Sequence, residues 1–361
     1  MRIVSVIDLK NGDQLARPIL NEKGKILLHK GVSLTPRMIE KLREYEFSYV
    51  YIDDEETAGI EPQSPISERD KIQAIQTIKE TFDELNSSSL SSHSYILSSA
   101  GKNLKNLIRN ILHHIQLNKD ILSLLSDIFI THDYLFTHSL NVAIYSLTIA
   151  KELGYPPKKL EEIGIGAILH DIGKVEVPQD ILMKPDHLKD EEFAEMKKHT
   201  TYGYEILRKK SGLPLVVAHC AFQHHERLNG SGYPRGIQEK DIHPYAKIIA
   251  VADVFDAMTT NRLYRNSKLP HEALEILYAG SGTLFDQKCV EIFRKKVAVY
   301  PNGLNVVLSD GRKGIVSKQN NQLADRPVIR ILQENDRPVE KPYEIDLAKE
   351  LNVVIVDCQT V

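Results

Sequence analysis

Residues 168–174 read Ile-Leu-His-Asp-Ile-Gly-Lys and place an imidazole next to a carboxylate at the end of an apolar helical segment. An unpaired Asp171 charge in such surroundings would cost on the order of several kcal/mol, so a metal ion, another cation or solvent must compensate it. A carboxylate can also bridge two metal ions. Lys174, one turn further on, is a candidate proton donor or phosphate contact. By itself the His-Asp pair also fits a solvated or structural role.

Around this stretch the chain predicts a succession of helices. Leu140, Ile144 and Leu147 share one helical face, and Gly154 before Pro156 is typical of a helix end. The sequence therefore predicts a mainly α domain, a helical bundle, over residues 126–298.

The two ends of the chain have β patterns. Residues 1–55 contain Asn11-Gly12, which predicts a hairpin, and Thr35-Pro36, which predicts the start of one helix followed by a strand. Residues 299–361 alternate around Asp310-Gly311 and contain a further strand pattern, LNVVIVD. We expect a small β-rich domain at the N-terminus and a small β unit at the C-terminus.

Residues 56–125 predict a linker and a helical connector. The stretch 53–70 is acidic and rich in proline and serine, which favours an exposed linker. Helical spacing follows at Ile72, Ile75 and Ile78, and a serine cluster at 87–92 interrupts it. The segment is expected to be a connector or a dimerising stalk.

Other polar residues could join Asp171 in a site. His224 and His225 would point about 100° apart on a helix and could serve two metals. Asp253 lies in an apolar helical run, where metal ligation, a capping role or solvent exposure would each explain it. Asp256, one turn on, could orient the site. His138 and His199 are weak candidates individually, because a surface histidine would explain either.

Together these residues carry a resemblance: residues 126–298 resemble the HD-GYP family, a branch of the HD metal-dependent phosphohydrolases. The motifs are HSLNVA from 138, HDIGK from 170, a histidine at 199, HHE-x-x-NGSGYP from 224 and VADVFDAMTTNRLYR from 251.

The resemblance implies a centre of two divalent metal ions, with iron or manganese favoured, and Asp171 as the bridge between them. The implied metal ligands are His138, His170, Asp171, His199, His224, His225 and Asp253. Two such metals generate a hydroxide nucleophile and stabilise the attacking and leaving oxygens. The implied catalytic residues are Asp171 and Lys174.

The resemblance also implies residues that hold the substrate: Lys174, Gly232, Tyr233, Pro234, Arg262 and Arg265. Arginine offers phosphate a planar fork of donors, and a tyrosine ring can stack beside a base. Three positions depart from the family pattern. Asn229 replaces the usual Asp, Leu263 replaces a common Pro, and Tyr134 stands where three-metal relatives have Glu, so we expect two metals.

The function implied is hydrolysis of cyclic di-GMP to pGpG, to GMP or to both. Two alternatives stay open: a non-catalytic cyclic di-GMP receptor, and a phosphohydrolase for another cyclic or linear nucleotide. The expected partner is thus a small cyclic dinucleotide, while a homodimer and a protein signalling partner are left open.

Composition and charge argue against several classes of protein. A net charge of -3 over 361 residues argues against DNA or RNA polymers as partners. The three cysteines are scattered, which predicts neither a disulfide framework nor a cysteine metal cluster. We find no apolar run long enough for membrane insertion and expect a cytoplasmic protein.

Overall fold

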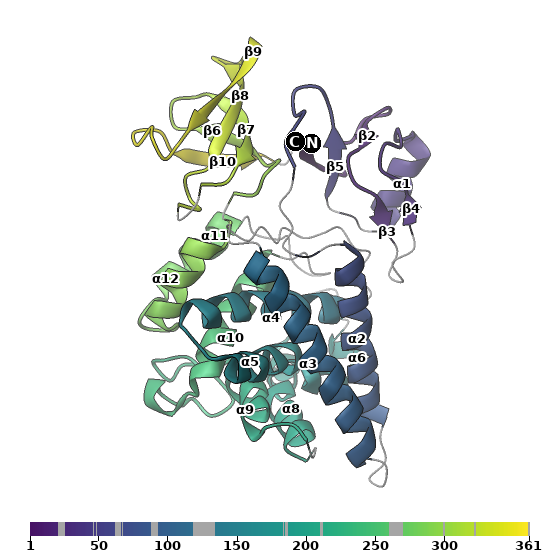
Figure 1. Ribbon diagram of the computed structural model, residues 1–361, viewed down its shortest axis with the longest axis vertical. Helices are drawn as coiled ribbons and strands as arrows, with labels where there is room; N and C mark the ends of the chain where they lie inside the picture. The colour runs from purple at the N-terminus through teal and green to yellow at the C-terminus, as the bar shows by residue number, and fades with distance from the viewer. Residues whose placement is uncertain are drawn as a thin grey trace.

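The computed structural model describes the chain except for residues 21–25, 46, 48, 62–65, 67, 88–92, 118–133, 183, 185, 186, 210, 211, 260–269, 299, 321, 322, 360 and 361. It consists of a helical domain with two small β-rich units side by side at one end (Figure 1). The predicted fold class, a mainly α bundle with a β unit at each end, is confirmed. No described helix is both long and apolar enough to cross a membrane.

The N-terminal unit is a three-stranded sheet with one helix and a separate strand pair. Its elements are β1 (Arg2–Ser5), β2 (Gln14–Leu15), β3 (Ile19–Leu20), β4 (Ile26–Leu28), α1 (Pro36–Glu44) and β5 (Tyr49–Asp53). The predicted helix start is confirmed, because the Thr35 side chain accepts a hydrogen bond from the Met38 backbone N–H at 3.4 Å.

The hairpin predicted at Asn11-Gly12 is wrong. A turn does form there, and Gly12 has a φ of 98°. However, β5 lies between β1 and β2 in the sheet, which has the order β1-β5-β2. The later strand β5 thus pairs with both β1 and β2, which do not pair with each other.

The helical domain begins with two long helices that belong to its core. These helices are α2 (Glu68–Ser87) and α3 (His93–Leu117), and they pack against each other and against α4 and α5 (Figure 1). Ile78, Phe82 and Ile108 are at most 1% exposed. In this chain the predicted connector is therefore part of the bundle and not a free stalk.

The rest of the domain consists of helices of different lengths. They are α4 (Tyr134–Glu152), α5 (Pro157–Leu169), η1 (Ile172–Glu176), α6 (Gln179–Leu182), α7 (Asp190–Lys197), α8 (His199–Arg208), α9 (Leu215–Gln223), η2 (Glu239–Asp241), α10 (Pro244–Thr259), α11 (Pro270–Ala279) and α12 (Gln287–Lys296). The predicted stop at Gly154 is confirmed, since α4 ends two residues before it.

The C-terminal unit is an antiparallel sheet of order β10-β6-β7-β8-β9. Its strands are β6 (Asn305–Leu308), β7 (Lys313–Lys318), β8 (Val328–Glu334), β9 (Arg337–Asp346) and β10 (Ile355–Gln359). The predicted turn at Asp310-Gly311 joins β6 to β7, and the Gly311 N–H donates to the Leu308 carbonyl at 2.9 Å. The strands of the C-terminal sheet also belong to the same hydrophobic cluster as the helices.

The segment after β5 ties the two β units together. Thr57 and Ile60 are buried, so the exposed linker expected over 53–70 is wrong for these residues. Arg330 of β8 donates hydrogen bonds to the backbone carbonyls of Glu56 and Ala58 at 3.2 and 2.8 Å. The chain therefore uses this segment as a packing surface.

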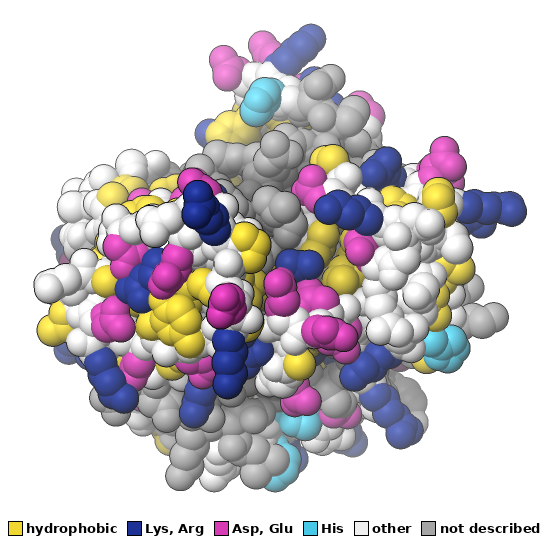
Figure 2. Space-filling view, turned by 90° about the horizontal axis from the view of Figure 1, so that it is seen from above, with side chains coloured by type: hydrophobic (Ala, Val, Ile, Leu, Met, Phe, Trp, Pro, Cys, Tyr) yellow, Lys and Arg dark blue, Asp and Glu magenta, His cyan; other side chains and the backbone are white. Residues whose placement is uncertain are grey.

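The face seen in Figure 2 carries acidic and basic side chains close together, with hydrophobic side chains between them. This agrees with the net charge of -3. The three cysteines are free and buried.

We predict that Phe82→Ala lowers the free energy of unfolding of the helical domain by about 3–5 kcal/mol, because truncating a buried aromatic ring leaves a cavity. The ring is 1% exposed and lies 5.3 Å from the ring of Phe136. Urea unfolding followed by circular dichroism measures the change. Leu215→Ala, at a side chain that is 57% exposed, is the control. Equal midpoints for the two variants would show that α2 does not stabilise the domain.

Candidate metal centre

Five histidines and two aspartates from separate helices meet in the interior. His138 lies in α4, Asp253 in α10 and His199 at the first residue of α8, while His170-Asp171 follow α5 and His224-His225 follow α9. All are at most 5% exposed except His225, whose side chain is 19% exposed. The structure thus brings together every residue that the sequence assigned to the metal centre.

The Asp171 carboxylate lies at the middle of the cluster. Its Oδ1 is 3.4 Å from His199 Nε2 and 3.8 Å from His224 Nε2. Its Oδ2 is 3.4 Å from His170 Nε2 and 3.6 Å from His138 Nε2. One carboxylate therefore presents each oxygen to a different pair of imidazoles, which is the arrangement that a bridging ligand requires.

Two groups of candidate ligand atoms share this carboxylate. The first group contains Asp171, His199, His224 and His225, and the second contains Asp171, His138 and His170. Within each group the candidate ligand atoms lie no more than 4.8 Å from one another. The donors are nitrogen and oxygen only, a set that suits first-row divalent metals.

Backbone carbonyls orient three of the rings. The Nδ1 atoms of His170, His199 and His224 lie 2.7, 2.7 and 2.9 Å from the carbonyl oxygens of Ala167, Met196 and Ala221. With Nδ1 donating, the Nε2 lone pair faces the centre. In the described chain, His170 Nε2 and Asp171 Oδ1 are buried without a hydrogen-bond partner. A cation would satisfy both atoms, so these residues fit divalent metal.

His138 is oriented by a carboxylate instead. Its Nδ1 lies 2.6 Å from Asp256 Oδ2, and Asn141 Nδ2 donates to Asp256 Oδ1 at 2.9 Å. Burial acts to lower the pKa of His138, but hydrogen bonds to Asp253 and Asp256 raise it to about 9. A metal ion at Nε2 would take the place of a proton. Asp256 thus has the orienting position that the sequence suggested.

The other titratable groups have pKa values that suit metal binding at neutral pH. Burial lowers the pKa of His199 to about 4 and those of His224 and His225 well below the usual value. Burial would raise the pKa of Asp171, yet Lys174 and His170 hold it well below its usual range. The imidazoles of His199, His224 and His225 are therefore neutral and the Asp171 carboxylate is ionised, the forms that coordinate metal.

Lys174 lies at the edge of the cluster on η1. Its Nζ donates to Asp171 Oδ2 at 2.5 Å, and its side chain is 14% exposed. Gly173 beside it allows η1 to approach α8, because a Cβ there would lie 1.9 Å from the His199 carbonyl oxygen. The absence of a side chain at Gly173 thus allows Lys174 of η1 and His199 of α8 to lie at the same site.

Comparison with known families identifies this helical region. Residues 116–289 match the family model described as HD domain, and residues 305–361 match a KOW domain associated with HD domain. Residues 116–289 form an HD domain. The resemblance seen in the sequence is confirmed.

Curated relatives of the HD domain include phosphodiesterases from several bacteria. A cyclic di-GMP phosphodiesterase of Thermotoga maritima is 45% identical over 159 residues, covering 44% of this chain and 43% of that protein. A cyclic di-GMP phosphodiesterase of Pseudomonas aeruginosa is 33% identical over 213 residues, which are 59% of this chain and 51% of that protein. A 3'3'-cGAMP-specific phosphodiesterase of Vibrio cholerae is 40% identical over 156 residues, covering 43% and 30%. The chain spans about half or less of these relatives.

The fold also has a solved counterpart. An HDG"Y"P protein from Bdellovibrio bacteriovorus aligns with a TM-score of 0.50 and 19% identity, over 81% of this chain and 97% of that chain. At this identity the match supports the fold alone.

A loop of the HD domain brings Tyr233 to the metal centre. The Tyr233 ring stacks on His225, with centroids 4.6 Å apart and an interplanar angle of 30°. Gly232 makes this possible, because a Cβ there would lie 2.4 Å from Arg227 N and from the His225 carbonyl oxygen. The Tyr233-Pro234 peptide is cis. Gly232 thus allows the loop to approach His225 closely, and the role of Pro234 in presenting Tyr233 stays a prediction.

The sequence analysis missed Glu226, which closes this loop. Its side chain is buried, and its two carboxylate oxygens accept the backbone N–H groups of Arg235 and Ile237 at 2.9 and 3.1 Å. An acidic residue directly after His224-His225 in a buried segment was the feature that could have indicated this role.

Asn229 stabilises the turn that follows it. Its Oδ1 accepts hydrogen bonds from the Ser231 backbone N–H at 3.0 Å and from Ser231 Oγ at 2.7 Å. Because an aspartate oxygen would accept the same two bonds, the departure from the family residue preserves the turn. Arg262, Leu263 and Arg265 lie outside the described residues, as does the Tyr134 side chain.

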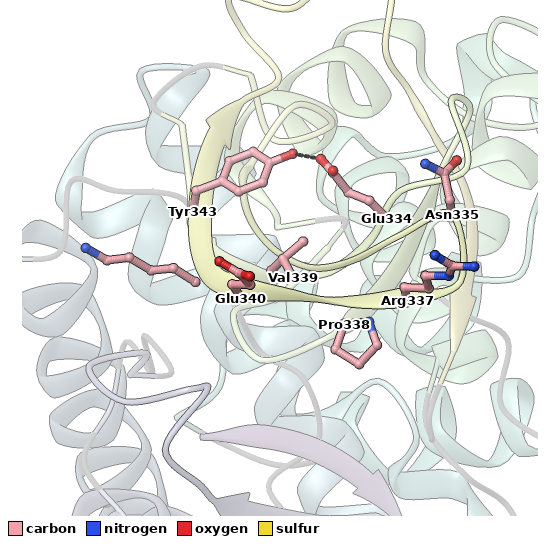
Figure 3. Close-up of a pocket in the computed structure, with 8 residues that line it drawn as sticks. Glu334, Asn335, Arg337, Pro338, Val339, Glu340 and Tyr343 are labelled. Atoms are coloured by element: carbon pink, nitrogen blue, oxygen red, sulfur yellow. Dashed lines mark hydrogen bonds between the residues drawn. The ribbon is translucent and has the colours of Figure 1, made fainter.

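The C-terminal sheet contains a separate pocket (Figure 3), a hollow of about 570 Å³ lined by residues of the β8–β9 hairpin. Tyr343 donates a hydrogen bond to Glu334 across it. The hairpin turns through Asn335 and Asp336, with φ values of 49° and 58°. The pocket contains none of the HD-domain residues described above.

We predict that Asp171→Asn strongly lowers bound divalent metal. Loss of an outer partner of a ligand already costs roughly 10- to 100-fold in metal affinity, and a shared carboxylate contributes more. Elemental analysis after anaerobic metal loading and desalting measures the effect. Asp8→Asn, at an exposed position, is the control. Equal metal content in the two variants would contradict a ligand role for Asp171.

We also predict that Glu226→Ala exposes the loop amides while metal content is retained. Both N–H groups are partly buried and would lose their acceptor, which leaves them open to water. Hydrogen–deuterium exchange should therefore be faster at Arg235 and Ile237. Glu226→Gln keeps one acceptor oxygen and should give an intermediate rate. Unchanged protection in Glu226→Ala would show that another contact holds the loop.

Proposed function

We propose that this HD domain is a metal-dependent phosphodiesterase that hydrolyses cyclic di-GMP to pGpG, GMP or both. The observation that carries the proposal is the Asp171 carboxylate, shared by two groups of histidines and contacted by Lys174. Relatives named cyclic di-GMP phosphodiesterases support the choice of substrate.

In this proposal the ligands are the seven residues His138, His170, Asp171, His199, His224, His225 and Asp253, and they hold two divalent ions, iron or manganese. Bound there, the ions would lower the pKa of water and neutralise charge on the phosphate. The mutual distances of the ligand atoms and the buried Asp171 Oδ1 support this assignment.

The chain's own groups supply binding and proton transfer. A water oxygen attacks phosphorus and its proton is released to solvent, the bond from phosphorus to the ribose 3'-oxygen breaks, and Lys174 Nζ gives that oxygen a proton and later regains one from solvent. Asp171 holds the ammonium at 2.5 Å, so the donor is positioned before substrate binds. Tyr233, Arg262 and Arg265 would hold the base, sugar and phosphates of the substrate.

A second substrate, 3'3'-cGAMP, is favoured by relatives named as specific for it at 36–40% identity. Both dinucleotides present the same phosphodiester to the centre and differ in one base. The receptor alternative is less well supported, because a complete set of ligands for two metal ions beside a candidate proton donor is the arrangement that hydrolysis requires.

We predict that Lys174→Ala reduces kcat for cyclic di-GMP by roughly 100-fold or more, the usual contribution of general acid catalysis, without loss of metal. The assay uses protein loaded anaerobically with ferrous iron or manganese. Chromatography follows pGpG and GMP, and 3'3'-cGAMP is run in parallel. Lys158→Ala, at an exposed position of α5, is the control.

Metal-loaded protein that binds cyclic di-GMP without cleaving it would overturn the proposal in favour of a receptor. Faster turnover of 3'3'-cGAMP would keep the chemistry and change the substrate. Full activity in Lys174→Ala would remove the lysine from the mechanism.

A further inference from the structure

An aromatic ring and a cation lie together on the outer side of α7. Phe193 and Lys197 are one turn apart, and Lys197 Nζ lies 4.5 Å from the centroid of the Phe193 ring. Phe193 is 45% exposed, so part of its ring faces solvent. The pair thus presents a flat ring and a positive charge to solvent.

This pair adjoins the metal centre. Lys197 Nζ also lies 5.6 Å from the centroid of Tyr233, and Tyr233 stacks on His225. Lys197 is the last residue of α7, and His199 begins α8 two residues later. A series of contacts therefore leads from the candidate ligand His225 through Tyr233 and Lys197 to Phe193.

The charge of Lys197 is available for a ligand. The nearby acids of α7 are engaged elsewhere: Glu192 accepts from Lys184 Nζ and the Lys189 backbone N–H, and Glu195 accepts from Lys198 Nζ. Among the residues that the structure describes, Lys197 forms no ion pair with a carboxylate. An anion beside this ammonium would therefore meet no competing carboxylate from the described part of the chain.

A cyclic dinucleotide has two phosphates and two bases, and the metal centre accounts for one phosphate only. We propose that Phe193 and Lys197 form an outer subsite for the other half of the substrate. A purine base stacks on the Phe193 ring, and the phosphate that is not cleaved lies beside Lys197. This inference rests on the proposed function, since it assigns the second half of the same substrate.

The test compares two substrates of the metal-loaded protein. Lys197→Ala and Phe193→Ala should each lower kcat/KM for cyclic di-GMP roughly tenfold, mainly through KM, which is within the range for one base stacked on an aromatic ring or one charged hydrogen bond. Hydrolysis of bis(p-nitrophenyl) phosphate, which lacks a second phosphate and any base, should be unchanged.

Two matched variants test whether the effect is specific to the charge of Lys197 and the ring of Phe193. Lys198→Ala removes the neighbouring lysine, which is paired with Glu195, and should leave both substrates unaffected. Phe193→Tyr keeps a ring and should restore most of the kcat/KM for cyclic di-GMP. Equal losses on both substrates would mean that α7 has only a structural role, and unchanged cyclic di-GMP kinetics would also overturn the subsite.

A failure of the proposed function can be distinguished from a failure of the outer subsite. If the unsubstituted protein cleaves neither substrate, calorimetric binding of cyclic di-GMP still tests the subsite. Weaker binding in Lys197→Ala and Phe193→Ala, but not in Lys198→Ala, supports it, and equal affinity in all three overturns it.

Discussion

The structure depends on one buried negative charge, the carboxylate of Asp171. Removing such a charge from water is costly unless partners surround it. Lys174 contacts it directly, and four imidazoles face its two oxygens. These partners come from α4, α5, η1, α8 and α9, so the helices must end or pass where the carboxylate lies. The packing of the helices and the geometry of the candidate metal centre therefore depend on the same residues.

The surrounding contacts fix the orientation of the ligands. Carbonyl oxygens at helix ends orient His170, His199 and His224, while Asp256 orients His138 from α10. Glu226 does the same for the loop that carries Tyr233, since its carboxylate accepts two partly buried backbone N–H groups of that loop. A rigid centre of this kind suits chemistry that requires fixed donors around a phosphate.

The β units are attached to the helical domain and to each other. The Ile3 N–H donates to the Gly303 carbonyl at 2.8 Å, and Arg330 contacts the segment after β5. Cys358 of β10 lies 3.7 Å from His271 of α11, so the C-terminal sheet also contacts a helix of the HD domain. Figure 1 shows both units at the same end of the bundle.

The sequence alone determined the fold class, the helix stops, most turns and the residue types of the centre, because glycine, proline and apolar spacing act within a few residues. It could not determine that β5 separates β1 from β2, nor that Thr57 is buried. The pairing of His138 with Asp256, 118 residues away, and the closure by Glu226 were likewise decided by tertiary structure. Local preferences favour an element, whereas packing between distant segments decides which side chains meet.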